Sequence, residues 1–365
     1  MKIAIVRGDF LSGWEIPNFL PLTKNNEVTL FVSHYPMQNV NIPPVFKVKK
    51  LWSAFDLNFG KISRYKLAFL NRLLVDAHIM YGLEEALKGY YIAYTAETFY
   101  GFTWQCLEAK RRGYVKRVLC HIGENILFNN EGIIGRRQIK QQALAKIDKF
   151  IVITEKAKEI ILAEGGNENK IVMAKPGVDL KIFKPIWFKK TGTRLLFVGR
   201  LIEEKGVREV VGIYKNLLGQ FPQLVLTVIG RGPLEGYVKK QGVNHVEWAD
   251  YHEMGKFYSR ADIYLHYSKG SPTWIEQYGF TLIEAMACGL LVVGLDVGSV
   301  KEVVGPGGLV VGPGEYESAV KSVLDSKILR RNLAKKAYDW ARRTYDARKF
   351  GSNLEKIFYA SLEGK

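Results

Sequence analysis

Short apolar segments recur along the chain and alternate with longer stretches in which apolar residues have helical spacing. The first series of segments comprises Ile3–Val6, Val28–Val32, Val45–Val48, Tyr91–Tyr94, Val115–Cys120 and Phe150–Ile153. The second series comprises Leu195–Val198, Leu224–Ile229, His245–Trp248, Ile263–Tyr267, Leu291–Leu295 and Leu309–Val311. Segments that are apolar nearly throughout are typical of strands buried on both faces of a parallel sheet. The alternation with helices therefore predicts two doubly wound, Rossmann-like α/β domains with right-handed crossovers.

A proline- and glycine-containing stretch separates the two series and predicts the domain boundary. Pro176, Gly177 and Pro185 interrupt both patterns. We expect a first domain over 1–178 and a second over 179–344. Ligands of open parallel sheets bind at the carboxyl ends of the strands, so the default site is the cleft between two such domains.

Composition excludes several classes of protein. The chain is 47% hydrophobic and 24% charged, which is a globular mixture rather than a disordered one. No apolar stretch is long enough to span a bilayer. The polar turn at Arg7-Gly-Asp9 predicts that the N-terminal segment is a strand and not a signal peptide. Three cysteines without a CxxC pair exclude a disulfide framework and a cysteine-rich zinc site, and indicate a reducing compartment.

The net charge of +17 is spread along the chain. Nucleic-acid binders usually concentrate their charge in one stripe or arm, whereas an even excess suits any polyanion, including nucleotide phosphates or an anionic membrane. The stretch 62–74 mixes cations with large apolar residues, and it predicts a helix that lies either on an anionic bilayer or on its own sheet. Aromatic residues at 90–104 are candidates either for stacking on an acceptor sugar or for core packing.

Two glycine turns resemble phosphate-binding motifs but lack essential residues. Gly8 and Gly13 have P-loop separation, yet Trp14 stands where lysine is needed, so an NTPase loop is excluded. Gly13 then either approaches a ligand or simply makes a turn. The turn that begins at Gly230 has Glu235 where a dinucleotide fingerprint needs its third glycine, which disfavours NAD or FAD. That turn is either a tight structural turn or a ligand contact.

The segment Phe197–Gly206 ends a strand and opens a helix with two cations, Arg200 and Lys205. Planar guanidinium donors, a lysine charge and the N–H groups of a helix N-terminus suit a diphosphate. The alternative is two solvated basic side chains in a loop.

Two carboxylates, Glu276 and Glu284, flank a glycine turn at Gly279. The turn directs the first amides of the next helix, those of Phe280, Thr281 and Leu282, towards a ligand. Each carboxylate can then reach a different part of one extended ligand, such as a sugar and a ribose. Pairing of the two glutamates on the surface is the alternative, but it explains neither the glycine nor the apolar setting.

These motifs together resemble the donor domain of a retaining glycosyltransferase of family 4, which has the two-domain GT-B fold. The matching pieces stand in the family's order, namely Pro176–Pro185, Phe197–Gly206, Val228–Pro233, Ala261–Ser268, Glu276–Gly289 and Asp296–Val303. The N-terminal half matches only in layout and in one histidine, His121. The resemblance implies an acceptor-binding domain over 1–178, a nucleotide-sugar-binding domain over 179–344, and a final helix, 345–365, that returns to the first domain.

The resemblance also implies roles for single residues. Arg200 and Lys205 would neutralise the donor diphosphate, Glu276 would bind hydroxyls of the transferred sugar, and Glu284 would bind the ribose. His121 would lie near the reacting sugar and act with Glu276 in catalysis. The remaining donor-binding candidates are Gly13, Gly230, Tyr251, Phe280, Thr281 and Leu282.

The expected function is transfer of a hexose, with retention, from a GDP- or UDP-sugar to a lipid-linked or saccharide acceptor. The chain contains no D-x-D triplet, so we expect the protein's own cations to meet the leaving-group charge without a metal or other cofactor. We expect a cytoplasmic protein, associated peripherally with the inner face of the membrane, that binds no nucleic acid. The alternative from another class is a non-catalytic basic protein that binds nucleic acid or an anionic membrane.

Overall fold

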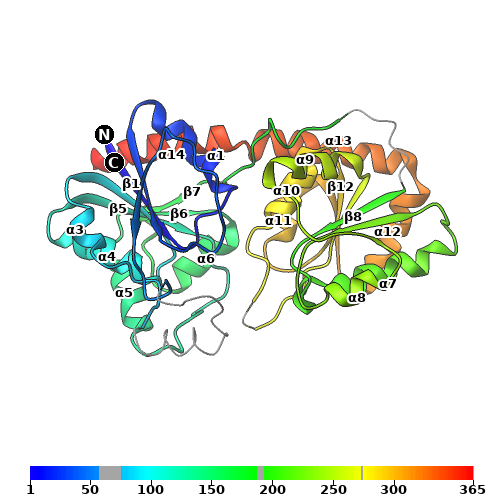
Figure 1. The fold of residues 1–365 in the computed structure, drawn as a ribbon, viewed down its shortest axis with the longest axis horizontal. Coiled ribbons are helices and arrows are strands. Elements are labelled where there is room, and N and C mark those ends of the chain that lie inside the picture. Colours follow the sequence, from blue (N-terminus) through cyan, green and yellow to red (C-terminus); the bar gives the residue numbers. More distant parts are fainter. Residues whose placement is uncertain (57–74, 187–192, 273, 365) are drawn as a thin grey trace. The chain divides into compact units, whose positions relative to one another are not determined.

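The computed structural model describes residues 1–56, 75–186, 193–272 and 274–364 (Figure 1). The chain forms two compact units, one of Met1–Lys175 with Arg348–Lys365 and the other of Pro176–Ala347. Each unit is a parallel sheet covered by helices, which confirms the predicted class of two Rossmann-like α/β domains. The amphipathic stretch 62–74 lies outside the described residues.

The sheet of the first unit has seven strands among the described residues, in the order β3-β2-β1-β4-β5-β6-β7, and every pairing is parallel. The strands are β1 (Lys2–Gly8), β2 (Glu27–Ser33), β3 (Lys47–Leu51), β4 (Tyr90–Ala96), β5 (Val115–Ile122), β6 (Lys149–Val152) and β7 (Ile171–Met173). The three-residue strand β7 has no counterpart among the predicted segments, because it is too short to give a pattern. The strand order reverses beside β1, which is where open sheets bind ligands.

Helices cover both faces of this sheet. One face packs against α3 (Leu83–Ala86), α4 (Gly101–Arg111), α5 (Arg136–Lys146) and α6 (Glu155–Ala163). The other face packs against α1 (Glu15–Phe19), η1 (Leu20–Lys24) and the last helix, α14 (Ala347–Leu362). Phe350, Leu354 and Phe358 of α14 are buried in the same cluster as Ile3 of β1. The expected return of the C-terminal helix to the N-terminal region is therefore confirmed.

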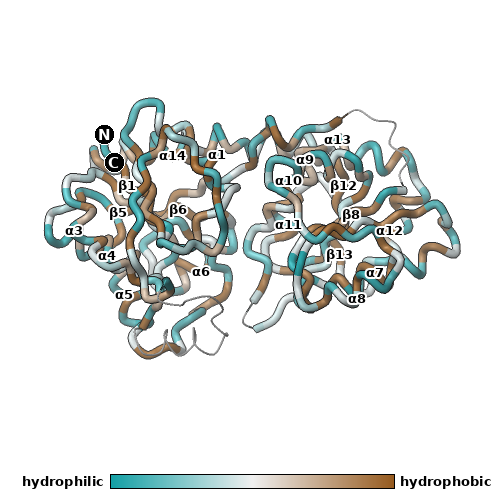
Figure 2. The backbone as a smooth tube through the Cα atoms, viewed as in Figure 1, coloured by the Kyte–Doolittle hydropathy of each residue, from teal (hydrophilic) through white to brown (hydrophobic). Residues whose placement is uncertain are grey.

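The second unit has six strands among the described residues, in the order β10-β9-β8-β11-β12-β13 and again all parallel. The strands are β8 (Arg194–Val198), β9 (Val225–Ile229), β10 (Asn244–Val246), β11 (Ile263–His266), β12 (Leu291–Leu295) and β13 (Gly308–Val311). The helices are α7 (Val207–Leu218), α8 (Glu235–Lys239), α9 (Tyr251–Arg260), α10 (Phe280–Ala287), α11 (Val300–Val304), α12 (Tyr316–Asp325) and α13 (Lys327–Thr344). Hydrophobic stretches run through the strands of both sheets, as the brown segments in Figure 2 show.

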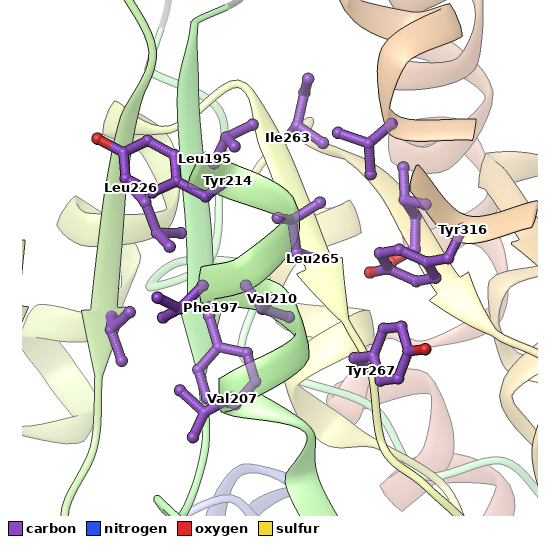
Figure 3. Packing of buried hydrophobic residues seen from close by; sticks show 14 of the residues in the cluster. Leu195, Phe197, Val207, Val210, Tyr214, Leu226, Ile263, Leu265, Tyr267 and Tyr316 are labelled. Carbon is purple, nitrogen blue, oxygen red and sulfur yellow. The ribbon is translucent and has the colours of Figure 1, made fainter. Parts of the chain in front are cut away.

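The two faces of β11 have different partners. Ile263, Leu265 and Tyr267 point into a buried hydrophobic cluster together with side chains of α7 and α12 (Figure 3). Side chains two residues apart point to the same face of a strand, so Tyr264 and His266 lie on the other face. That face meets α9 and α10, because the rings of Tyr258 and Tyr264 lie 5.9 Å apart. The helices that carry the predicted site residues therefore cover the polar side of β11.

Candidate active site

The basic loop that follows β8, residues 199–206, packs closely against the end of β11. Gly206 has a φ of +67°, and a Cβ there would lie 2.3 Å from the carbonyl oxygen of Tyr267. Only glycine fits this position, because both the positive φ and the close backbone approach exclude a side chain. The short 3₁₀ turn η3 (Glu203–Lys205) precedes it. The loop thereby places Lys205 beside the residues that follow β11, while Arg200 is exposed on the same loop.

The glycine turn after β9 supports this basic loop. A Cβ on Gly230 would lie 1.9 Å from the carbonyl oxygen of Gly199, and one on Gly232 would lie 2.5 Å from that of Leu201. The amide of Leu201 donates to the carbonyl oxygen of Arg231 at 2.8 Å. Both glycines are therefore required by close backbone packing, and the turn fixes the conformation from which Arg200 projects.

Lys205 contacts three groups at once. Its Nζ lies 2.6 Å from Oε2 of Glu276, 3.4 Å from Oγ of Ser268 and 4.7 Å from the centre of the Trp274 ring. A cation over a tryptophan face and beside a carboxylate is held in a defined position. The structure thus brings together two of the residues that the sequence singled out, Lys205 and Glu276.

Glu276 is a fixed carboxylate held by a small hydrogen-bond network. Besides Lys205, its Oε2 lies 2.8 Å from Oγ of Ser268, which donates to it, and 3.1 Å from Nε2 of His266. Burial opposes ionisation of this side chain, but hydrogen bonding with His266 and the charges of His266 and Lys205 outweigh burial and lower the pKa of Glu276. Glu276 is therefore an anion throughout the neutral range.

Sequence reasoning assigned no role to His266 and Ser268. Both belong to the quoted segment Ala261–Ser268, in an apolar context that suggests only a buried strand. The alternation of polar and apolar residues was the available signal. Tyr264, His266 and Ser268 stand two residues apart, so their polar atoms lie on one face of the predicted strand.

Glu284 lies inside the second turn of α10 and is 7% exposed. Its Oε2 accepts a hydrogen bond of 2.7 Å from the hydroxyl of Tyr258 on α9. Burial raises the pKa of Glu284 to about 7, against the opposing effect of the Tyr258 hydrogen bond. Tyr258 is a further residue that the sequence did not reveal, because its partner is reached only by the packing of α9 on α10.

Gly279 directly precedes α10, and its φ of +74° requires glycine. The amide of Leu282 donates to the carbonyl oxygen of Gly279 at 2.9 Å. The amides of Phe280 and Thr281 are the two that precede it, at the positive end of the helix dipole.

Tyr251 is the first residue of α9. Its ring packs edge-on against Phe183, with ring centres 5.3 Å apart. Burial, followed by the charge of Glu284, raises the pKa of the Tyr251 phenol. Trp248, predicted as the end of a strand, lies beyond β10 and is 65% exposed, because the edge strand ends at Val246.

The first unit holds the other two predicted residues. Gly13 lies in the turn between β1 and α1. His121 was expected to follow its strand, but β5 continues to Ile122 because the amide of Glu97 bonds to the carbonyl oxygen of His121 at 2.9 Å. Its Nδ1 lies 3.0 Å from the hydroxyl of Tyr94. Burial, helped by the charge of Arg7, lowers the pKa of His121 to about 3, so the imidazole is neutral at physiological pH.

The aromatic stretch at 90–104 is divided between core and surface. Tyr94 and Phe102 are fully buried and Phe99 is 6% exposed. These three rings pack in the interior of the first unit, as the core-packing alternative predicts for part of the stretch. Tyr91 is 39% exposed, but it lies near the amino end of β4.

Within the described ranges, no group of three or more His, Cys, Asp or Glu side chains is placed to hold a metal ion. In the same ranges, no helix is both long and apolar enough to cross a bilayer.

Comparison with known proteins identifies relatives of this architecture. The sequence profile described as "Glycosyl transferases group 1" matches residues 179–340. A D-inositol 3-phosphate glycosyltransferase of Catenulispora acidiphila is 28% identical over 244 residues, which are 58% of this chain and 55% of that protein. The chain spans about half the length of the D-inositol 3-phosphate glycosyltransferases that it matches.

Two solved structures share the fold along the whole chain. The sucrose-phosphate synthase of Thermosynechococcus elongatus has a TM-score of 0.75 at 19% identity and covers 100% of both chains. Anabaena HepE, solved as a complex with UDP, has a TM-score of 0.71 at 16% identity, covering 99% of this chain and 100% of its own. At such identities the likeness establishes the fold alone.

Proposed function

We propose that this chain, which belongs to the group 1 glycosyltransferase family, transfers a hexosyl group with retention from a nucleotide-diphosphate sugar to a lipid-linked or saccharide acceptor. The observation that carries the proposal is the arrangement around Glu276. The Glu276 carboxylate, whose pKa is lowered, lies 2.6 Å from the lysine of a basic loop. It precedes α10, the helix that carries the second buried carboxylate, Glu284. A non-catalytic basic protein needs none of these buried groups.

The roles of the residues follow from the charge that develops during the reaction. Loss of a nucleoside diphosphate creates negative charge, which preorganised cations and helix N–H groups stabilise. Lys205, Arg200 and the amides at the start of α10 are the groups that meet this charge. Glu276 accepts hydrogen bonds from hydroxyls of the transferred sugar, and Glu284 accepts those of the ribose.

Retention places the incoming acceptor on the same face as the leaving phosphate, and the departing phosphate oxygen takes the acceptor's proton. His121 contributes as a neutral imidazole, in keeping with its low pKa of about 3. Its Nδ1 is engaged with Tyr94, so Nε2 is the atom that would contact a sugar hydroxyl. Gly13, Gly230 and Tyr251 complete the proposed donor site.

The choice of donor and acceptor rests on the similar proteins. HepE structures are described as complexes with UDP and with UDP-glucose, which favours a UDP-hexose donor here, with a GDP-sugar as the other candidate. The names of the matched relatives refer to inositol phosphate and to phosphatidylinositol, which favours an acceptor that carries a sugar-like ring on a phosphate or a lipid. The excess of 53 basic over 36 acidic side chains favours work at the anionic inner face of a membrane, in the cytoplasm.

Thermal-shift measurements with UDP, GDP, ADP and free uridine test the proposal. A nucleoside diphosphate should raise the melting temperature of the wild-type protein, because a ligand stabilises the state that binds it. Arg200→Ala should weaken binding on the order of tenfold by removing one charge-assisted contact to phosphate. The matched control is Arg331→Ala, an exposed arginine on α13, which should bind as the wild type does. No shift with any nucleotide would favour the non-catalytic alternative.

Transfer should persist in excess EDTA. The chain lacks a D-x-D triplet, and Arg200, Lys205 and the start of α10 supply the positive charge that a divalent ion supplies in other transferases. Initial rates of nucleotide release from a UDP-hexose, measured with EDTA and with added Mg²⁺, should agree within a factor of about two. A rate that vanishes with EDTA and returns with Mg²⁺ would show that these cations are insufficient.

A further inference from the structure

Exposed aromatic side chains gather where β2 and β3 end in the first unit. Tyr35 follows β2 and is 62% exposed, while Trp52 follows β3 and is 46% exposed. Tyr81, 53% exposed, lies beside them because its amide donates to the carbonyl oxygen of Trp52 at 2.7 Å. Single exposed apolar residues are common on protein surfaces, whereas a cluster of large ones is typical of a surface that binds a ligand, a partner or a membrane.

The rings of this cluster form a platform. The imidazole of His34 stacks on the indole of Trp52, with ring centres 4.2 Å apart and planes 16° from parallel. Tyr35 meets the same indole edge-on at 6.0 Å. One face of Trp52 is therefore covered by His34, while the side chain as a whole stays 46% exposed.

A buried carboxylate holds the two loops of the platform together. Asp56 is 3% exposed, and it accepts hydrogen bonds from the amide of Tyr35 at 2.8 Å and from the amide and hydroxyl of Ser53 at 2.8 and 3.0 Å. Burial of a carboxylate is costly unless its oxygens are hydrogen-bonded, as they are here. The loop after β2 is thus tied to the loop after β3, and the platform is fixed before any ligand arrives.

We propose that Trp52, backed by His34 and flanked by Tyr35, is the subsite for a pyranose ring of the acceptor saccharide. A pyranose presents a flat face of C–H groups and a polar rim, which matches an aromatic plane with polar neighbours. The platform lies at the carboxyl edge of a parallel sheet, where ligands of this architecture bind. Stacking on His34 and the hydrogen bonds of Asp56 hold the ring in one orientation, which suits the recognition of one sugar ring. This inference rests on the proposed function, because it supplies that reaction's acceptor.

Binding to immobilised gluco-, galacto- and manno-configured oligosaccharides tests the subsite. The wild-type protein should bind at least one of them, Trp52→Ala should bind it roughly tenfold more weakly, and Trp52→Phe should fall between the two. The matched control is Tyr91→Ala, which removes a 39% exposed ring near the amino end of β4 and should bind as the wild type does. Circular dichroism and the UDP-induced thermal shift check that each variant is folded, and Tyr35→Ala serves as a second platform variant.

A second comparison separates a free saccharide from the headgroup of a glycolipid. The same sugar is offered in solution and on glycolipid in phosphatidylcholine vesicles, beside vesicles of phosphatidylcholine and phosphatidylglycerol without sugar. Trp52-dependent binding to either sugar-bearing probe supports the proposal. Equal binding by wild type and both platform variants, no binding of any saccharide, or Trp52-dependent binding to the sugar-free vesicles overturns it.

The failure of this inference and that of the proposed function give different results. Trp52 is not among the residues proposed to bind the nucleotide, most of which belong to the second unit. Trp52→Ala should therefore keep the UDP-induced shift and the slow hydrolysis of donor by water while losing transfer through a higher acceptor KM. A protein with Trp52-dependent saccharide binding but no nucleotide binding would refute the transferase and leave the subsite standing.

Discussion

A Glu284→Gln variant will be more stable than the wild type above neutral pH and will bind nucleoside diphosphate more weakly. Burial raises the pKa of Glu284 in the folded protein to about 7, from 4.5. A raised pKa means that the folded state is favoured at low pH and loses stability as pH rises through the folded pKa. Glutamine remains neutral, so the gain should be small near pH 4.5 and reach about 3 kcal/mol above pH 7.

Urea unfolding at about pH 5 and about pH 8 measures this gain. The amide oxygen of glutamine still accepts the Tyr258 hydrogen bond, so packing is retained. Loss of the negative charge should weaken UDP binding roughly tenfold, because hydrogen bonds to a charged acceptor are about twice as strong as neutral ones. Glu253→Gln, on the exposed face of the neighbouring helix α9, is the control. Parallel pH profiles for wild type and Glu284→Gln would contradict the buried, destabilising charge.

A Glu276→Gln variant will lose transfer while it keeps nucleotide binding. The carboxylate is held by Lys205, Ser268 and His266, and an uncharged amide cannot replace it as the partner of all three. Removal of one preorganised electrostatic contact from an active site costs on the order of 10²–10³ in kcat, and we expect a loss of that size. The UDP-induced thermal shift should stay within about threefold in affinity, because Glu276 is proposed to contact the sugar and not the nucleotide.

Single-turnover rates with a UDP-hexose, together with UDP titrations of the same samples, separate these two effects. Ser268→Ala removes one of the donors to Glu276 and should give an intermediate loss of kcat. If Glu276→Gln turns over at the wild-type rate, the assigned role is wrong. If it loses UDP affinity as steeply as kcat, Glu276 instead positions Lys205 for the diphosphate.

Local pattern was sufficient to predict most of the fold. Most strands are apolar and rich in β-branched residues, with the edge strand β3 as an exception. Each glycine that the site needs stands where the backbone must turn, as Gly206 and Gly279 do. These features are encoded within a few neighbouring residues. Strand β7 was not predicted, because three residues are too few to show an alternating pattern. The N-terminal half contains no motif that matches the family beyond His121.

The partners of the two carboxylates were beyond the reach of local pattern. Tyr258 contacts Glu284 only because α9 packs on α10. His266 contacts Glu276, which lies ten residues further along the chain. Alternation places His266 and Ser268 on one face of their strand, but it does not show which side chain they contact. The aromatic platform could not be predicted from the sequence for a similar reason. Tyr35 and Trp52 are single residues in separate loops, and only the hydrogen bonds of Asp56 hold these loops together.

The contact between Lys205 and Glu276 bears on which anions can compete for the site. At 2.6 Å the two charges largely cancel each other before any substrate arrives. If an inorganic phosphate bound Lys205, Glu276 would lose its partner at 2.6 Å. The phosphate carries no sugar hydroxyl that could replace this contact. In the proposed donor site a nucleotide sugar would bring hydroxyls that replace the lost contact, so we expect free phosphate to compete only weakly with the complete donor.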